Sequence, residues 1–521
     1  MGRPALDLYR RKFAKLIGIT ADDELAWLIW AVSTLQSSRP ERAKLLISYP
    51  EEAVTQDVGS RYYAHPWRME TIFNEALVAP KIEVNQPPYR KLVCTSFGAM
   101  AMLMNAIGKV EDQESGLSLK YLDVISELHR IAQRQFEWQR GFINLGALYR
   151  ASFIYGGPLA RGRFADRRGI ELDDFCRCCF VLMASWFSRP IMARDSDFSV
   201  AGISKQQLDA TLEAISIEHA EDRILAAKQR ATENQTAYKQ SILRQYPVIR
   251  FNNDSEYLIA PLPQLISSRA TSGLYYDLIG GRGDVRNEIS GRFENYCRRI
   301  IRTVLSDAAV VDGSLYSIRG RSFETFDAGI LDAGEIAVIV ECKATKLTYD
   351  AKFSEFPLVE AEDKYSEIVK GVFQIWRYIS HVRRGLAPAA AISKDAVGMV
   401  LTLDAWLMMS TPMQREVTNR AVKLAKSQES EITSEDQIPV IFCPIDDLEL
   451  VLANCTSESL LETARKSAHD EFYGWMMYNV HQQLFPEIRH GRTYPFLEQL
   501  PEVAPWWGDM QAIMGRGPPN V

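Results

Sequence analysis

The apolar run at residues 336–340, which leads directly into Glu341, Cys342 and Lys343, places the strongest constraint on the fold of this chain. Isoleucine and valine fill most of the run, and short β-branched runs are typical of buried strands. Side chains two residues apart on a strand point to the same face, so Glu341 and Lys343 project together. Charged groups in a core are unfavourable unless they pair or bind a metal ion. We therefore expect a sheet with a polar site at the end of this strand.

An acidic residue upstream of the run supplies a partner for this site. Asp327 precedes Glu341 by fourteen residues, and the apolar residues between them are interrupted by a turn-forming segment at 331–335. This pattern predicts two strands joined by a turn. Asp332 is the alternative acid, but it lies within the turn, where aspartate and glycine are ordinary. We therefore expect Asp327 to be the acid that approaches Glu341.

Two carboxylates and a lysine at the edge of a sheet are suited to metal-assisted hydrolysis. Mg²⁺ prefers oxygen ligands and is usually held by one or two carboxylates together with water and substrate phosphate. Asp327, Glu341 and the main-chain carbonyl of Cys342 are the expected ligands, with Mg²⁺ or Mn²⁺ as the cofactor. Lys343 would orient or deprotonate the attacking water, or stabilise charge on the phosphate oxygens. The residues thus favour hydrolysis of a phosphodiester.

The composition argues against some classes of protein. A formal net charge of −6 and a pI near 5.8 disfavour a chain coated in nucleic acid, although they are compatible with a local basic groove. Arg298, Arg299 and Lys346 are the candidate contacts to nucleic acid, and a plain solvent-exposed role is the alternative for each of them. The longest uncharged segment, 93–108, is too short and too polar to span a bilayer, and the chain begins without a signal-peptide pattern. We expect a cytoplasmic protein that makes no membrane contact.

Periodicity divides the chain into three parts. Residues 1–246 show mainly helical spacing, including a segment that begins with a capping box at Ser204 and is expected to stay helical to about residue 246. Across 247–455 short strands alternate with helices, as in an α/β sheet with helices on its faces. Residues 456–521 form a helical C-terminal extension. Besides the two strands around Asp327 and Glu341, the expected strands are 248–251, 257–260, 398–403 and 440–443, and the expected helices are 288–305 and 360–382.

These motifs resemble the PD-(D/E)XK superfamily of restriction-endonuclease-like nucleases. Phe326-Asp327 followed by Glu341-x-Lys343 is similar to the metal-binding signature of that family, with phenylalanine where the family name has proline. Glu294 lies on the preceding helix, where the family carries a glutamate. There are two alternatives: Glu288 on the same helix could be the glutamate of the site, or Glu294 could be a plain solvent-exposed residue.

A further element resembles the RecB-like branch of this superfamily. Gln374 and Tyr378 fit the pattern Gln-x-x-x-Tyr in the helix after the Glu-x-Lys strand, and residues four apart share one helix face. The histidine ligand and the four-cysteine cluster of some branch members are not recognisable here. The resemblance covers about residues 285–450 and implies a restriction-endonuclease-like mixed sheet flanked by helices. It implies catalytic roles for Asp327, Glu341, Lys343, Glu294 and Gln374. It also implies that Glu294 is one of the metal ligands and that Tyr378 contacts nucleic acid.

The resemblance leads to a hypothesis about function. We expect a Mg²⁺-dependent nuclease that hydrolyses DNA, as an endonuclease, with RNA as the alternative substrate. A large helical region joined to such a nuclease is similar to arrangements in bacterial anti-phage defence, so residues 1–246 are expected to sense a trigger or bind a partner and to gate cleavage. This hypothesis is compatible with a partner protein, with an ATPase or helicase subunit, or with self-association. The alternatives are a catalytically silent DNA-binding or assembly subunit, and a repair or restriction nuclease.

Overall fold

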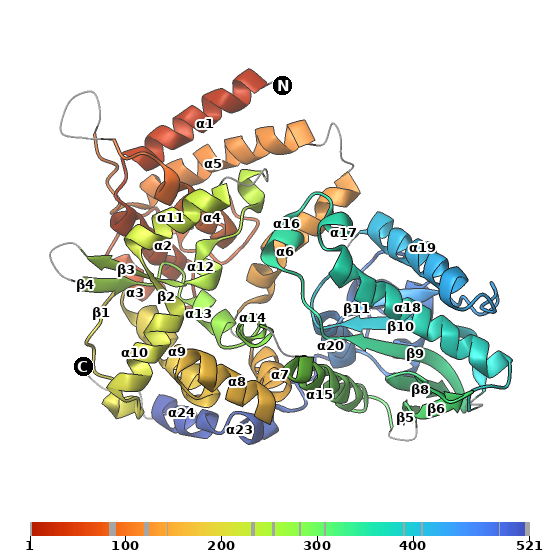
Figure 1. Cartoon of the computed structure of the whole chain (residues 1–521). Coiled ribbons are helices and arrows are strands. Elements are labelled where there is room, and N and C mark those ends of the chain that lie inside the picture. Colours follow the sequence, from red (N-terminus) through yellow and green to blue (C-terminus); the bar gives the residue numbers. More distant parts are fainter. Residues whose placement is uncertain are drawn as a thin grey trace.

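A computed structural model gives the fold of the chain (Figure 1). It describes residues 3–82, 90–118, 124–142, 144–230, 235–252, 256–280, 283–306, 309–388, 391–407, 410–488 and 490–515. The protein is a mixed α/β structure in which two sheets are flanked by helices. Among the described residues, no helix is both long enough and apolar enough to cross a membrane.

The larger sheet has five strands in the order β11-β10-β9-β8-β5. Strands β9, β10 and β11 run parallel, and β8 is antiparallel to both β9 and β5. The apolar run forms β9, as predicted, in the centre of this sheet, where both faces are covered. The bounds of the strands are β5 (Val310–Asp312), β8 (Ala328–Asp332), β9 (Glu335–Lys343), β10 (Ile392–Thr402) and β11 (Val440–Pro444).

Helices cover both faces of this sheet, as the alternation of strands and helices predicts. On one face α18 (Glu362–Arg383) packs against β9 and β10, and α19 (Thr411–Gln428) packs against α18. On the other face lie α15 (Gly283–Ile301), α20 (Ile445–Asn454) and α21 (Ser457–Ser467). Short helices α16 (Tyr349–Phe353) and α17 (Pro357–Glu360) lie between β9 and α18. A separate hairpin of β6 (Leu315–Ile318) and β7 (Arg321–Glu324) precedes β8.

The smaller sheet corrects the division of the chain at residue 247. The expected strands near 248–251 and 257–260 are present as β3 (Val248–Asn252) and β4 (Glu256–Ile259). They pair with β1 (Ile191–Ala193) and β2 (Ser216–Glu218) in the order β1-β4-β3-β2, not with the larger sheet. The backbone hydrogen bonds of these strands therefore tie residues on both sides of position 247 together.

The predicted helix from Ser204 to about residue 246 is not continuous, because a short strand interrupts it after residue 215. Ser204 does form the capping box, and α10 (Lys205–Ile215) follows it. The chain then becomes β2, whose backbone groups pair with β3, before α11 (His219–Arg230) begins. Residues 231–234 lie outside the described residues.

The remaining helices lie mainly in the N-terminal half. They are α1 (Arg3–Gly18), α2 (Asp22–Leu35), α3 (Glu41–Lys44), α4 (Pro66–Val78), α5 (Phe97–Ser118), α6 (Val124–Arg140), α7 (Leu145–Tyr155), α8 (Pro158–Arg168), α9 (Leu172–Ser188), α12 (Ile242–Gln245), α13 (Gln264–Arg269) and α14 (Leu274–Leu278). The C-terminal helices are α22 (Met477–Leu484), α23 (Leu500–Val503) and α24 (Trp506–Gly515). Short 3-10 turns are η1 (Glu51–Ala53), η2 (Ser199–Ala201), η3 (Thr236–Tyr238) and η5 (Leu497–Gln499).

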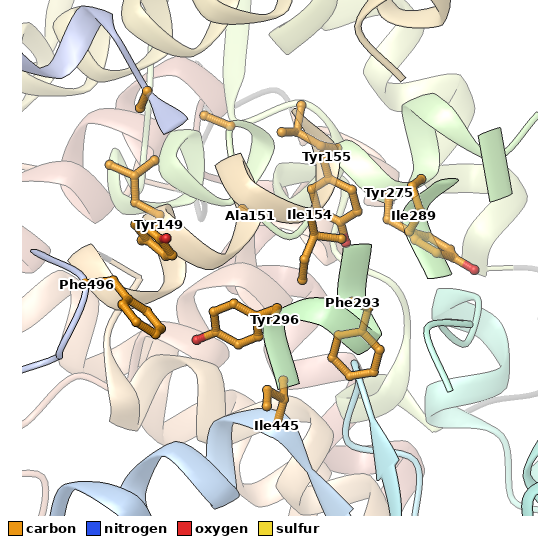
Figure 2. Close-up of a cluster of buried hydrophobic side chains, with 14 of the residues drawn as sticks. Tyr149, Ala151, Ile154, Tyr155, Tyr275, Ile289, Phe293, Tyr296, Ile445 and Phe496 are labelled. Carbon is orange, nitrogen blue, oxygen red and sulfur yellow. The ribbon is translucent and has the colours of Figure 1, made fainter. Parts of the chain in front are cut away.

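A buried aromatic cluster joins the larger sheet to the helices before it. Figure 2 shows Phe293 and Tyr296 of α15 between Ile154 and Tyr155 of α7 on one side and Ile445 of α20 on the other. Phe293 and Tyr296 are fully buried. The same hydrophobic core continues into α9 and α24, so the C-terminal extension also packs on the N-terminal half.

We predict that Phe293→Ala destabilises the protein by about 3–5 kcal/mol, because it removes a fully buried ring from a packed core. Urea unfolding followed by circular dichroism measures the change. Phe356→Ala is the control, since Phe356 is 59% exposed, and we expect it to stay within about 0.5 kcal/mol of the unmodified chain. Equal unfolding midpoints for the two variants would contradict the prediction.

Candidate active site

Strand β9 delivers Glu341 and Lys343 to the face that is covered by α18. Ile339 belongs to the core on the α18 side, whereas Val340 belongs to the core on the α15 side. Because side chains alternate along a strand, Glu341 and Lys343 share the face of Ile339. Glu341 is only 3% exposed. The prediction that these two residues project together is confirmed by their contact, in which Lys343 Nζ lies 3.3 Å from Glu341 Oε2.

Helix α18 adds Gln374 to this pair. Lys343 Nζ donates a hydrogen bond to Gln374 Oε1 at 2.8 Å, so the ammonium group bridges the strand and the helix. Gly371 lies one turn earlier on α18, and a Cβ there would lie 3.0 Å from Lys343 Cε. The missing side chain at Gly371 therefore lets the helix approach closely enough for Gln374 to reach the lysine.

Asp327 joins the site from the neighbouring strand. Its backbone N–H donates to the Val340 carbonyl at 3.0 Å, just before β8 begins. Its Oδ2 accepts a hydrogen bond from the Cys342 N–H at 2.6 Å. The N–H and C=O of one strand residue point to the same side, so the Cys342 carbonyl also faces the Asp327 side. By this strand geometry, Asp327 and the Cys342 carbonyl lie on the same side of β9.

The acidic groups of the site destabilise one another's charge. Burial, reinforced by the Asp327 charge and opposed by Lys343, raises the pKa of Glu341 to about 8. Burial and the Asp327 charge likewise raise the pKa of Glu294 on α15 to about 7. Burial raises the pKa of Asp327 above its usual range, although the Cys342 N–H counteracts this. Glu294 therefore belongs to the same electrostatic cluster as the two strand carboxylates.

A fourth acid, Glu324, was missed by sequence reasoning. It is exposed at the end of β7, and its charge raises the pKa of Glu294, Asp327 and Glu341. Glu324 lies three residues before Asp327, within the same acidic segment. This closeness in sequence is the signal from which Glu324 could have been predicted as a neighbour of Asp327. The two charges come together because β7 returns toward the sheet.

The residues present fit a divalent cation held by oxygen atoms. Several carboxylates with raised pKa values face a single ammonium group, whose own pKa is also raised by Glu341 and Asp327 despite burial. A cation between the acids would offset their mutual repulsion. Among the described residues, no group of three or more histidine, cysteine, aspartate or glutamate side chains is arranged so that it could hold a metal ion. Asp327, Glu341 and the Cys342 carbonyl would accordingly need water or substrate oxygens to complete the coordination.

The two alternatives that the sequence leaves open have other roles. Both Glu288 carboxylate oxygens accept backbone hydrogen bonds from Leu159 and Ala160, at the start of α8. Asp332 pairs with Arg465 of α21 at 2.7 Å. Glu288 and Asp332 therefore stabilise contacts between elements. Glu294 and Asp327, and not these two alternatives, lie with Glu341 at the site.

Three of the predicted nucleic-acid contacts are corrected by burial or by other partners. Tyr378 is 2% exposed and packs edge-on against Phe326, so its ring is a core residue although it lies four positions after Gln374. Arg299 donates to Gln499 at 2.8 Å and lies over the rings of Phe153 and Phe496, which makes it a packing residue.

Lys346 is the third corrected residue. It is 7% exposed, and its Nζ donates to the Ser272 carbonyl at 3.3 Å. It lines a cavity of about 190 Å³ together with Arg140, Arg150 and Asp404, a lining that does not include Glu341 or Lys343. The turn after β9 carries Lys346 away from the site and into the contact with the N-terminal helices.

Arg298, the fourth residue expected to contact nucleic acid, lies beside Asp327. Its Nη1 donates to the Asp327 carbonyl at 3.1 Å, and its Nε lies 3.5 Å from Asp312 Oδ1. The positive charge also lowers the pKa of both Glu294 and Asp327, against the stronger effect of burial. Arg298 therefore positions the Asp327 segment, and its side chain is 23% exposed.

Comparisons with known proteins add no further constraint. No protein-family model, curated protein or solved structure matches the chain. The assignment of the site accordingly depends on its geometry and chemistry.

We predict that Glu341→Gln removes a pH-dependent loss of stability. Because the folded pKa of Glu341 is raised from 4.5 to about 8, the folded state binds more protons than the unfolded state between these values. Stability without metal should therefore fall as pH rises from about 5 to 8, and it should fall less in Glu341→Gln. Thermal melting in EDTA across this range measures the difference.

The same variant separates this effect from metal binding. At the upper end of the pH range Mg²⁺ should raise the melting temperature of the unmodified chain, but not that of Glu341→Gln. Glu367→Gln on α18, an exposed acid that pairs with Lys370, is the matched control and should behave like the unmodified chain in both buffers. A Mg²⁺ response that survives in Glu341→Gln would count against Glu341 as a ligand.

Proposed function

We propose that this protein is a Mg²⁺-dependent nuclease that hydrolyses phosphodiester bonds in DNA. The observation that carries the proposal is the convergence on one buried polar site of four residues from β9, α18 and the position just before β8, namely Asp327, Glu341, Lys343 and Gln374. The order α15, β8, β9, α18, β10 supports the proposal, because the resemblance to restriction-endonuclease-like nucleases implies a helix, then the strands with the Asp and Glu-x-Lys motifs, then a helix with Gln-x-x-x-Tyr.

The residues suggest a division of labour during hydrolysis. In the reaction a water oxygen attacks phosphorus and the bond to one ester oxygen breaks, so a phosphomonoester and a free hydroxyl are formed. Bound Mg²⁺ would supply Lewis-acid polarisation and a more acidic water. Asp327, Glu341 and the Cys342 carbonyl would hold the ion, and Glu294 would add negative charge nearby. Gln374 keeps the Lys343 side chain oriented toward Glu341.

The protonation state of Lys343 favours one of its possible roles. Glu341 and Asp327 raise the pKa of Lys343, so the side chain is an ammonium group at neutral pH. An ammonium group cannot remove a proton from water, but it can stabilise the charge that develops on the phosphate oxygens. We therefore assign Lys343 to charge stabilisation and to orientation of the attacking water.

A catalytically silent DNA-binding or assembly subunit is less consistent with these contacts. Glu341 is almost fully buried and its pKa is strongly raised, which makes the ionised form unfavourable when no metal is bound. A module that only binds DNA has no use for such a group. A raised pKa combined with a specific charge partner is typical of functional sites.

We predict that Lys343→Ala lowers Mg²⁺-dependent cleavage by about 10²–10³-fold, the usual loss when one charge-stabilising group is removed. Supercoiled plasmid, linear duplex and single-stranded DNA are the substrates, and RNA tests the alternative. Lys370→Ala is the control, because Lys370 is an exposed lysine on α18 that pairs with Glu367. Cleavage by Lys343→Ala at the rate of this control, with both variants folded by circular dichroism, would refute the assignment.

We further propose that the helical half gates cleavage, as in an effector of bacterial anti-phage defence. Helix α6 contacts the segment that follows each of the three parallel strands. Arg130 donates to the Phe353 carbonyl at 3.0 Å after β9, Gln133 donates to the Ala405 carbonyl after β10, and Arg140 pairs with Asp446 after β11. Figure 1 shows α6 beside α16, at the side of the sheet that faces the N-terminal helices. A shift of α6 would therefore act on the strand that carries Glu341 and Lys343.

If α6 restrains the site, then the double variant Gln133→Ala/Arg140→Ala should raise basal cleavage by about 2- to 30-fold, which corresponds to about 0.5–2 kcal/mol of coupling. Initial rates of plasmid cleavage by the full chain measure it. Gln139→Ala, an exposed position on the same helix, is the control. Unchanged or reduced activity of a folded double variant would argue against gating through α6, and would favour a constitutive repair or restriction nuclease.

A further inference from the structure

The hairpin of β6 and β7 leads directly into the active site but belongs to neither sheet. It forms a two-stranded ribbon in which Leu315 pairs with Glu324 and Ile318 pairs with Arg321. Its base is closed by hydrogen bonds between Ser314 and Thr325. Asp327 follows two residues later. The position of the hairpin is therefore coupled to the position of the Asp327 carboxylate.

One face of the hairpin is anchored on α18. The Tyr316 and Phe323 rings stack with 5.7 Å between their centroids, and the Tyr316 hydroxyl lies 2.7 Å from His381 Nδ1. His381 also meets Phe323 edge-on, and Arg377 lies over the Phe323 ring at 5.2 Å. These contacts hold the ribbon in a fixed direction relative to the helix that carries Gln374.

The other face and the tip are open to solvent. Ser317 and Ser322 are exposed and lie opposite each other in the middle of the ribbon. At the tip Arg319 (φ 49°) and Gly320 (φ 80°) both have left-handed backbone conformations, which is the geometry of a two-residue hairpin turn. Arg319 and Arg321 are both exposed.

The two arginines at the tip differ from three other arginines of this unit, which pair with acidic side chains. Arg302 pairs with Asp312, Arg383 pairs with Asp436, and Arg384 pairs with Glu429. Among the described residues, neither Arg319 nor Arg321 forms an ion pair or a hydrogen bond through its side chain. In a chain with a net charge of −6, these two exposed guanidinium groups give the tip of the hairpin a local positive charge.

We propose that the β6–β7 hairpin contacts the backbone of duplex DNA, with Arg319 and Arg321 on phosphates and the Ser317 and Ser322 hydroxyls available as further donors. This proposal rests on the proposed nuclease function. Arginine and serine side chains are common donors to DNA phosphates, and a two-stranded ribbon fits the major groove.

Binding measurements in EDTA test this proposal without requiring cleavage. Fluorescence anisotropy of a labelled mixed-sequence duplex, at several salt concentrations, compares the unmodified chain with Arg319→Ala/Arg321→Ala. Each phosphate contact contributes about 0.9 to the slope of log K against log salt, so the double variant should lower that slope by nearly 2. Lys423→Ala/Lys426→Ala on α19 removes the same charge from exposed positions of the same unit and should leave the slope unchanged.

The outcomes distinguish this proposal from the nuclease assignment. A reduced slope together with absent cleavage would refute the nuclease function but retain the hairpin as a DNA contact. Normal cleavage with an unchanged slope, an equal effect in the α19 control, or no binding of the duplex by the unmodified chain would refute the hairpin proposal. An equal slope loss on a single-stranded oligonucleotide would overturn its restriction to duplex DNA.

Discussion

The bridge that Lys343 makes between Glu341 and Gln374 is the interaction on which the site depends. One ammonium group ties the central strand to the helix that covers it, and it is the nearest positive charge to a buried carboxylate. Removal of one partner from a buried pair leaves the other charge uncompensated, which is why such pairs are sensitive to substitution. The close approach of α18 at Gly371 is part of the same arrangement, because any side chain there would press on the lysine.

The acidic cluster around this bridge is unfavourable for the isolated protein. Glu341, Asp327 and Glu294 come from β9, the start of β8 and α15, and each has a raised pKa because burial and neighbouring acids disfavour its charge. A core that served stability alone would place apolar residues at these positions. The cluster is understandable if a cation and a phosphate bind next to these acids during function, since both would then interact with groups that are already in place.

The surroundings link this site to the rest of the molecule through two separate routes. Helix α15 carries Glu294 and Arg298 on the side of the site and Phe293 and Tyr296 in the core that is shared with α7. Helix α6 reaches the ends of β9, β10 and β11 through polar contacts. Apolar packing of the first kind is rigid, whereas polar contacts at the ends of strands can exchange for water. The second route is therefore the better candidate for regulation.

The sequence alone determined the local features of the site. An apolar β-branched run dictates a buried strand, strand alternation places Glu341 and Lys343 together, and the turn at 331–335 returns Asp327 to the neighbouring strand. Helical periodicity placed Gln374 and Tyr378 on one helix, but only tertiary packing decided that Gln374 reaches Lys343 while Tyr378 is buried against Phe326. Packing likewise placed Glu324 near the cluster, chose Glu294 over Glu288, and paired β3 and β4 with strands from the N-terminal half. Periodicity reports which face of an element is apolar, whereas the partner of that face is selected by contacts between residues far apart in the chain.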